Sequence, residues 1–159
     1  MKIGVISDTH MQSPSADLIR VNNLYFTDVD LILHAGDLVS LEVLKAFARK
    51  EVIAVRGNMD LPDAARKLAT KEIVEVNGFR IGLIHGWGSP HGLETKIRKE
   101  FERVNAIVYG HTHKSVSHTS EDILFFNPGA FKPASISLGD KTVGIITIDS
   151  SITGEIISV

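Results

Sequence analysis

Three short apolar runs in the first third of the chain constrain the fold most. Ile3–Ile6, Leu31–Leu33 and Val52–Val55 are continuous apolar segments, as expected for strands that are covered on both faces. Each run is followed by glycine or serine beside a polar side chain that is able to bind a metal ion. Ligand sites in open α/β sheets lie at the carboxyl ends of strands. The three runs therefore predict an α/β fold with a site at these strand ends.

Segments with apolar residues at helical spacing lie between and after these strands. Ser13 is expected to cap a helix with Pro14 at its first position, and the helix runs to about Phe26 with Ile19 and Tyr25 among its inward-facing residues. Further helices are predicted from Ser40 to about Lys50, from Leu61 to Ala69, and from Leu93 to Val104.

The second half of the chain changes to a β pattern. Ile73–Val76 and Phe79–Ile84 flank Asn77-Gly78, a dipeptide typical of tight hairpins. Later strands are predicted over Ala106–Tyr109, Ile123–Phe126, Ser135–Leu138, Val143–Asp149 and Glu155–Val159. A helix-rich first half and a hairpin-rich second half predict two sheets that pack face to face with helices outside.

Length, charge and composition exclude several classes of protein. A chain of 159 residues is most simply one domain, residues 1–159. The absence of cysteine removes disulfides, thiolate metal ligands and cysteine nucleophiles. A net charge of -2 argues against binding of duplex nucleic acid, which requires a basic face to neutralise phosphates.

The distribution of apolar residues predicts a cytoplasmic protein without a membrane partner. The first strand meets Asp8 too early to be the apolar region of a secretory signal. No apolar run approaches the roughly 18–20 residues that span a bilayer. The β-rich C-terminal third offers a pairing edge, and on that ground we expect a homodimer.

Metal-binding side chains recur at the ends of five predicted strands. Taken singly, each cluster is open to a simpler interpretation, such as a turn, a buried histidine or a polar loop. Together they supply two aspartates, four histidines and an asparagine, which suit two ions that share a carboxylate. These seven candidate ligands are Asp8, His10, Asp37, Asn58, His85, His111 and His113.

In order and form, these clusters resemble the signature blocks of the calcineurin-like metallophosphoesterases, and most closely the small bacterial and archaeal phosphodiesterases of that family. The blocks are Asp8-Thr-His10, Gly36-Asp37, Gly57-Asn58, His85 and Gly110-His111-Thr-His113, and Asn127-Pro-Gly129 follows them as in the small members. The resemblance implies a four-layer α/β/β/α sandwich, with the site where the loops of its two mixed sheets meet.

The resemblance also implies a role for each candidate ligand. Asp8, His10 and His113 would hold one divalent ion; Asn58, His85 and His111 would hold the second; Asp37 would bridge the two. Imidazole, carboxylate and amide ligands suit Mn²⁺, which we name first, or Ni²⁺, Fe²⁺, Zn²⁺ and Co²⁺, better than Mg²⁺ or Ca²⁺.

The expected reaction is hydrolysis of a small-molecule phosphodiester by in-line attack of a hydroxide that bridges the ions. Two divalent ions, two aspartates and one hydroxide leave roughly one positive charge to attract a phosphate ester. Asp37, Asn58, His85 and His111 are the expected catalytic residues, and Arg56, Asn58 and His111 are the expected contacts to substrate.

Three residues near the blocks qualify this expectation. Many relatives carry a histidine after the Gly-Asn asparagine, where this chain has Met59, which is unable to protonate a leaving group. The sequence therefore predicts a preference for diesters with good leaving groups over alkyl monoesters.

Asp60 and His34 are expected to support ligands from outside the metal site instead of binding metal themselves.

Two functions other than phosphodiester hydrolysis are alternatives for a chain of this kind. The retromer small subunit has the same fold and serves as a protein-interaction scaffold, so fold alone does not establish catalysis. A scaffold tolerates the loss of ligands, whereas this chain keeps all seven. A phosphatase acting on phosphoserine proteins is disfavoured because the chain is short and lacks the histidine acid.

Overall fold

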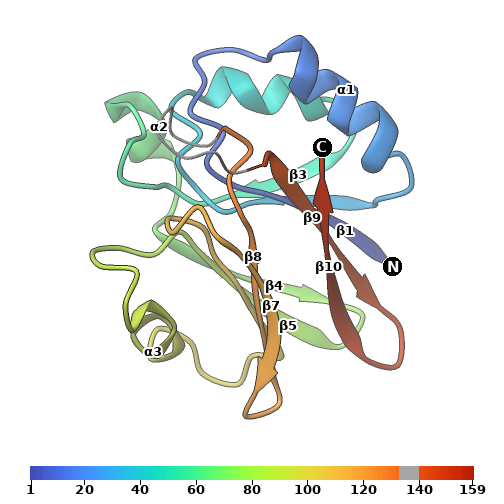
Figure 1. Cartoon of the computed structure of the whole chain (residues 1–159), viewed down its shortest axis with the longest axis vertical. Helices are drawn as coiled ribbons and strands as arrows, with labels where there is room; N and C mark the ends of the chain where they lie inside the picture. Colours follow the sequence, from blue (N-terminus) through green and yellow to red (C-terminus); the bar gives the residue numbers. More distant parts are fainter. Residues whose placement is uncertain (133–139) are drawn as a thin grey trace.

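The computed structural model describes residues 1–132 and 140–159, and two five-stranded sheets form its centre (Figure 1). The first sheet has the strand order β10-β9-β1-β2-β3, and the second has the order β4-β5-β6-β8-β7. The strands of the two sheets are β1 (Lys2–Ile6), β2 (Leu31–His34), β3 (Glu51–Ala54), β4 (Lys71–Val76), β5 (Phe79–Ile84), β6 (Ala106–Val108), β7 (Ser115–Ser120), β8 (Ile123–Pro128), β9 (Thr142–Ile148) and β10 (Ile152–Ser158).

Both sheets are mixed, and each contains three neighbouring parallel strands and two strands with antiparallel pairing. In the first sheet β1, β2 and β3 run parallel, and β9 and β10 continue it with antiparallel pairing. In the second sheet β5, β6 and β8 run parallel, and β4 and β7 pair antiparallel at its two edges. Because parallel strands run in the same direction, their carboxyl ends lie at the same end of each sheet, and the loops that follow them gather there.

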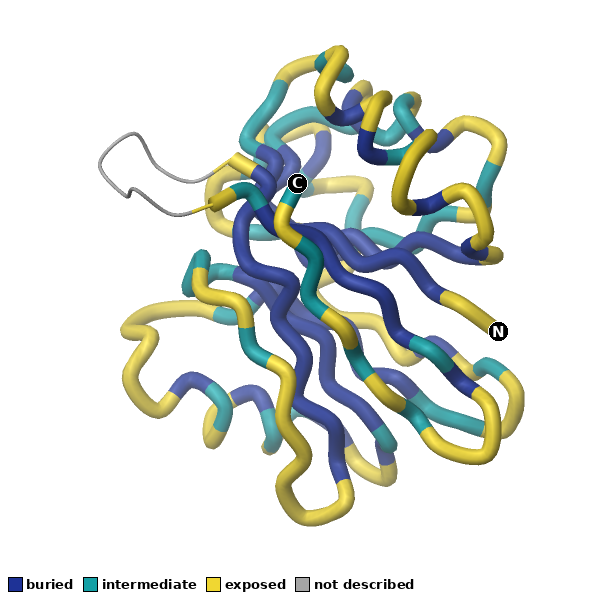
Figure 2. The backbone as a smooth tube through the Cα atoms, turned by 45° about the vertical axis from the view of Figure 1, so that its right-hand side comes forward, coloured by how far each residue is buried: buried dark blue, intermediate teal, exposed yellow. Residues whose placement is uncertain are grey.

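Three buried apolar clusters hold together four layers: the helices on one side, the two sheets, and the α3 segment on the other side. The largest lies between the sheets and draws buried side chains from both, such as Val5 and Leu33 from the first and Leu83 and Val108 from the second. The second packs the helices against the outer face of the first sheet, and the third packs the α3 segment against the outer face of the second. The buried tube in Figure 2 follows the middle of both sheets. The predicted α/β/β/α sandwich is confirmed.

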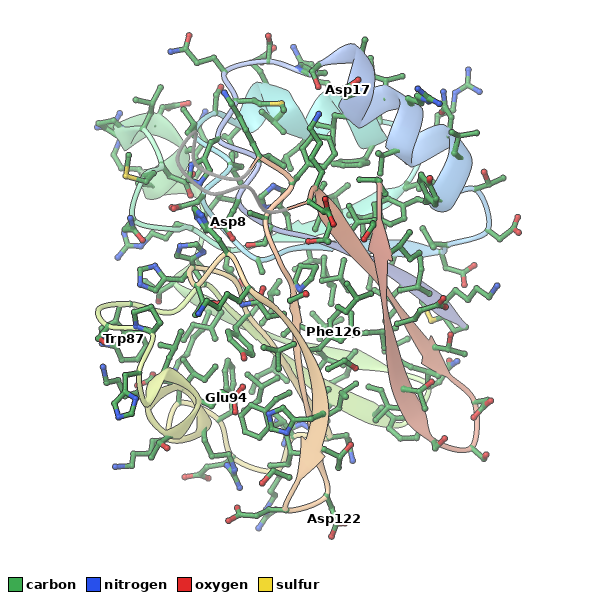
Figure 3. The ribbon with its side chains drawn as sticks, in the orientation of Figure 1. Asp8, Asp17, Trp87, Glu94, Asp122 and Phe126 are labelled. Atoms are coloured by element: carbon green, nitrogen blue, oxygen red, sulfur yellow. The ribbon has the colours of Figure 1, made fainter. Side chains whose placement is uncertain are left out.

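One aromatic side chain joins the two sheets. Phe126, on β8 of the second sheet, is fully buried and reaches Gly144 on β9 and Gly154 on β10 of the first sheet (Figure 3). A methyl group added at either glycine would collide with the Phe126 ring. The two glycines therefore make the space that this ring fills.

The helices are shorter than the sequence predicts. They are α1 (Ala16–Tyr25), the 3-10 helix η1 (Leu41–Phe47), α2 (Pro62–Lys67) and α3 (Leu93–Arg98). The prediction that α3 extends to Val104 was wrong, because the chain turns after Arg98, although Phe101 and Val104 remain buried against the sheet.

Helix α1 differs from its prediction in its cap and its inward face. Ser15, not Ser13, is the cap, and its Oγ accepts a hydrogen bond from the Leu18 N–H at 3.1 Å. Ile19 is 44% exposed and Tyr25 is 38% exposed, so the expectation that both face inward was wrong. The helix buries a narrow stripe that contains Leu18 and Val21. Ile19 follows Leu18 directly, and successive side chains of an α-helix point about 100° apart, so Ile19 turns away from the buried side.

The strand predicted over 135–138 lies outside the described residues. Within residues 1–132 and 140–159, no helix combines the length and the apolar character needed to cross a membrane.

Candidate metal centre

The seven candidate ligands follow the carboxyl ends of parallel strands in both sheets. Those from the first sheet follow β1, β2 and β3, and those from the second follow β5 and β6. The His111 N–H donates to Asp8 Oδ2 at 3.2 Å and so ties a loop of one sheet to a loop of the other. Figure 3 shows Asp8 where these loops meet.

A first group of ligand atoms comes from Asp8, His10 and His113, all within 4.8 Å of one another. His113 Nε2 lies 3.1 Å from Asp8 Oδ1 and 3.4 Å from His10 Nε2. His10 Nε2 is 3.8 Å from the same carboxylate oxygen. These three residues are the set expected for one ion, although 103 residues separate His10 from His113.

A second group consists of Asp8, Asp37 and His85, again within 4.8 Å, and all three are buried. His85 Nδ1 lies 2.7 Å from the Ala35 carbonyl oxygen, so Nδ1 carries the proton and donates it. This leaves the Nε2 lone pair facing Asp37 Oδ2 at 3.4 Å. A histidine whose second nitrogen donates to a backbone carbonyl is the usual arrangement of a metal ligand.

Two buried atoms of this site have no hydrogen-bond partner. They are Asp8 Oδ1, which lies near His113 without the geometry of a hydrogen bond, and His85 Nε2. An unsatisfied buried polar atom typically costs about 1–3 kcal/mol, so native proteins rarely keep one without a use for it. Both atoms are electron-pair donors aimed into the same group, and a divalent cation would satisfy both.

The electrostatics of the site favour positive charge. The contact with Asp8 raises the pKa of His113 above its ordinary value. Burial alone would lower the pKa of His85, but the close contact with the Asp37 carboxylate and the charge of Asp8 outweigh it and raise that pKa. Burial opposes ionisation of Asp37, yet contacts with His85 and the Met59 N–H hold its pKa below the usual range.

Asn58 and His111 lie at the side of these groups and contact each other. His111 Nδ1 is 3.0 Å from Asn58 Oδ1, and His111 Nε2 is 2.8 Å from the Gly88 carbonyl oxygen. The rings of His85 and His111 are 5.3 Å apart, centroid to centroid. The structure thus brings all seven candidates to one region, with five of them in the two compact groups.

The backbone at the site is held in an uncommon conformation. Asp8, His10, Asp37, His111 and His113 all have positive φ, between 46° and 66°. The left-handed region costs L-residues roughly 1–2 kcal/mol each, and clusters of such residues are typical of functional sites. Gly110 adds a steric constraint, because a methyl group there would collide with Ser7 Oγ and crowd the Asp8 carboxylate.

The residues expected to lie outside the metal site have other partners. Asp60 accepts hydrogen bonds from the N–H groups of Val39 and Gly57 at 2.6 and 2.7 Å. His34 is fully buried between Thr9 Oγ1 and the Gly36 N–H, and burial lowers its pKa to about 4.

Two supporting residues were missed by sequence reasoning. Ser7 Oγ donates to Asp8 Oδ2, and Asn127 Nδ2 donates to the Gly110 carbonyl oxygen at 2.8 Å. Ser7 directly precedes a candidate ligand, and Asn127 opens the Asn-Pro-Gly segment. Their positions in the sequence were visible, but the partners they hold were not.

Asp60 is predicted to position ligands without touching the metal. Its carboxylate ties together the loops after β2 and β3, which carry Asp37 and Asn58. Substitution Asp60→Ala should lower the affinity for Mn²⁺ by about 10–100-fold, as measured by calorimetric titration. Asp63→Ala is the control, because Asp63 is exposed and pairs with Lys67 on the surface of α2. Equal affinities of the two variants would contradict this role.

Comparison with known proteins agrees with the site. The calcineurin-like phosphoesterase superfamily domain matches residues 1–151. A protein of Methanocaldococcus jannaschii described as a probable metallophosphoesterase is 41% identical over 135 residues, covering 82% of this chain and 68% of the relative. A phosphodiesterase of the same organism is 33% identical over 172 residues, covering 99% of each chain.

Solved structures give the same result. An archaeal phosphodiesterase superposes with a TM-score of 0.78 at 28% identity over 100% of both chains. Vps29 of Entamoeba histolytica, solved in complex with zinc, superposes with a TM-score of 0.73 at 24% identity over 99% of both chains, which is a likeness of fold. With a family match over nearly its whole length and its candidate ligands at the expected strand ends, this chain belongs to the calcineurin-like phosphoesterase superfamily.

Proposed function

We propose that this protein is a phosphodiesterase that uses two divalent cations. The observation that carries the proposal is the pair of overlapping ligand groups around Asp8, with the buried atoms Asp8 Oδ1 and His85 Nε2 left unsatisfied. The 33%-identical relative and the archaeal neighbour that are named phosphodiesterases support the reaction class. The residues that would hold the ions are Asp8, His10, Asp37, Asn58, His85, His111 and His113.

The protein's own contribution is to fix charge and ligand direction before substrate arrives. Asp8 and Asp37 bring two negative charges, and the Ser7 and Met59 donors hold their carboxylates in place. When bound, the two ions would lower the pKa of a water molecule and stabilise negative charge on the phosphate oxygens. Asn58 and His111 lie at the open side of the site, where a phosphate ester would approach.

The donor set favours a transition metal, and we propose Mn²⁺. Four imidazoles, two carboxylates and one amide oxygen form a mixed set, whereas Mg²⁺ and Ca²⁺ prefer shells of oxygen alone. Ni²⁺, Fe²⁺, Zn²⁺ and Co²⁺ fit the same donors.

Restoration of activity by metal tests the function directly. Protein treated with chelator should be inactive on bis-p-nitrophenyl phosphate and should regain activity as Mn²⁺ is added, with about two ions bound per chain. Elemental analysis of the dialysed protein measures the ions independently of turnover. A protein that takes up no metal, or is inactive when fully loaded, would contradict the proposal.

Met59 predicts which esters react fastest. Its backbone N–H donates to Asp37 Oδ1 at 2.7 Å, but its side chain is 58% exposed and has no proton to give. Without a general acid here, esters whose leaving group departs as a stable anion should be favoured. We expect a higher kcat/KM for bis-p-nitrophenyl phosphate than for a sugar phosphate, and the reverse order would exclude this explanation.

A histidine at this position should restore part of the missing proton transfer. Met59→His should raise kcat for an alkyl monoester about tenfold or more, since general acid catalysis is typically worth about 10²–10⁴-fold. Turnover of bis-p-nitrophenyl phosphate should change little, because p-nitrophenolate leaves unaided. Met59→Leu, of similar size and equally unable to donate, is the control. An equal gain in kcat for the alkyl monoester in Met59→His and Met59→Leu would mean that the shape of the side chain, not proton transfer, causes the gain.

The scaffold function remains the alternative, and it makes opposite predictions. The likeness to Vps29 concerns the fold and is less close than the likeness to the archaeal phosphodiesterase. A scaffold needs neither bound metal nor turnover, so the restoration experiment separates the two.

A further inference from the structure

A pocket opens beside the proposed metal centre. Its volume is about 340 Å³, within the range of about 300–1,000 Å³ that holds small ligands. Asn58 and His85, two of the candidate ligands, form part of its wall. Its other lining residues include Arg56, Thr70, Lys71, Trp87 and Glu100. A substrate with its phosphate at the metal centre would therefore extend into this space.

Trp87 is the most distinctive residue of the pocket. It is the only tryptophan of the chain, and its side chain is 46% exposed, although tryptophan is usually well covered. Gly86 and Gly88 flank it with φ of 98° and 75°, a conformation that suits glycine. The Gly88 carbonyl oxygen lies 2.8 Å from His111 Nε2, so the Trp87 loop is fixed to a candidate ligand. Figure 3 shows Trp87 on this loop at the edge of the molecule.

The charges of the pocket favour an anionic ligand. Arg56, which lines the pocket, is a cationic side chain that donates to the Ala65 carbonyl oxygen. Lys71 pairs with Glu100 at 2.8 Å, so those two charges compensate each other. The Lys71–Glu100 pair and Thr70 also bring hydrogen-bond donors and acceptors to the lining of this pocket.

We propose that this pocket binds the nucleobase of a nucleotide ester, stacked on the Trp87 indole. The phosphate lies toward Asn58 and His85, and Arg56 adds positive charge at the pocket rim. The substrate class is then nucleotide-derived phosphodiesters, which deepens the proposed function and rests on it for the position of the phosphate. Base stacking on an aromatic side chain is strong enough to change affinity by about tenfold.

The test compares two ligands that differ only in the base. Adenosine 5′-monophosphate and ribose 5-phosphate share the sugar and phosphate. Because Trp87 is the sole tryptophan, its fluorescence reports on this pocket alone. In chelator-treated protein, the nucleotide should quench Trp87 and bind about tenfold more tightly than ribose 5-phosphate. In Mn²⁺-loaded protein, the same ratio should appear in the inhibition constants against bis-p-nitrophenyl phosphate.

Substitutions at Trp87 separate stacking from simple bulk. Trp87→Phe should keep most of the preference for the nucleotide, and Trp87→Leu should reduce the ratio of inhibition constants to about one. Hydrolysis of bis-p-nitrophenyl phosphate by the wild-type protein tests the proposed function separately. Equal affinity for both ligands in the wild-type protein would overturn the inference even if hydrolysis is normal. If hydrolysis fails, the fluorescence titration still decides whether the base is bound.

Discussion

Substitution of Asp37 by asparagine should reduce phosphodiester hydrolysis on the order of 10³-fold or more. The amide keeps the size of the side chain and an oxygen that accepts the Met59 N–H, so the loop should stay folded. It removes one of the two negative charges of the centre, which lie within 4.8 Å of each other. The proposed binding of divalent cations beside the buried His85 imidazole would depend on that charge. Activity with Mn²⁺ and metal content after dialysis are the measurements.

Two comparisons make this result specific. Asp17→Asn removes a carboxylate that pairs with Lys141 on the exposed side of α1, and it should leave activity unchanged. His113→Ala removes a ligand from the first group alone, so it should lose one ion and keep the other. If Asp37→Asn kept both ions and near-normal turnover, Asp37 would not be the shared ligand. Asp8, which belongs to both groups, would then be the residue to test.

The pattern of strands in the sequence predicts which residues gather at the carboxyl ends within each sheet. The runs that became β1 and β2 are buried, whereas β3 is only partly buried, but all three pair in parallel, so the residues after them gather at one end of the sheet. The same holds for β5 and β6 of the second sheet. That Asp8 and His113 meet, although they come from different sheets, was implied by the resemblance to the calcineurin-like metallophosphoesterases, and the structure places Asp8 Oδ1 3.1 Å from His113 Nε2.

Finer details depended on tertiary contacts that the sequence does not reveal. The positive φ of Asp8 and Asp37 follows from loops held by partners far along the chain, such as the His111 N–H and the Met59 N–H. Helix α1 buries a narrower stripe than its apolar residues suggest, because the covering of Ile19 depends on neighbours outside the helix. The Asn58–His111 contact depends on where two separate loops end.

Of the substitutions proposed for this protein, removal of the Phe126 side chain should lower the free energy of unfolding most. The ring is fully buried and reaches from the second sheet to the first, where it lies against Gly144 and Gly154. Phe126→Ala should lower the free energy of unfolding by about 3–5 kcal/mol, as measured by urea denaturation. The value should fall near the upper end, because glycine has no side chain that could move into the cavity.

The neighbouring Phe125 is the matched control for this prediction. It lies on the same strand but faces the outer cluster of the second sheet, where it stacks on His118, and it is 6% exposed. Its cavity would border the partly exposed His118 side chain, so Phe125→Ala should cost less than Phe126→Ala. The Phe126 variant should also weaken Mn²⁺ binding, because the ligands come from both sheets and this ring helps to hold the sheets together. Equal losses of stability and metal affinity in the two variants would show that the junction between the sheets does not depend on this ring.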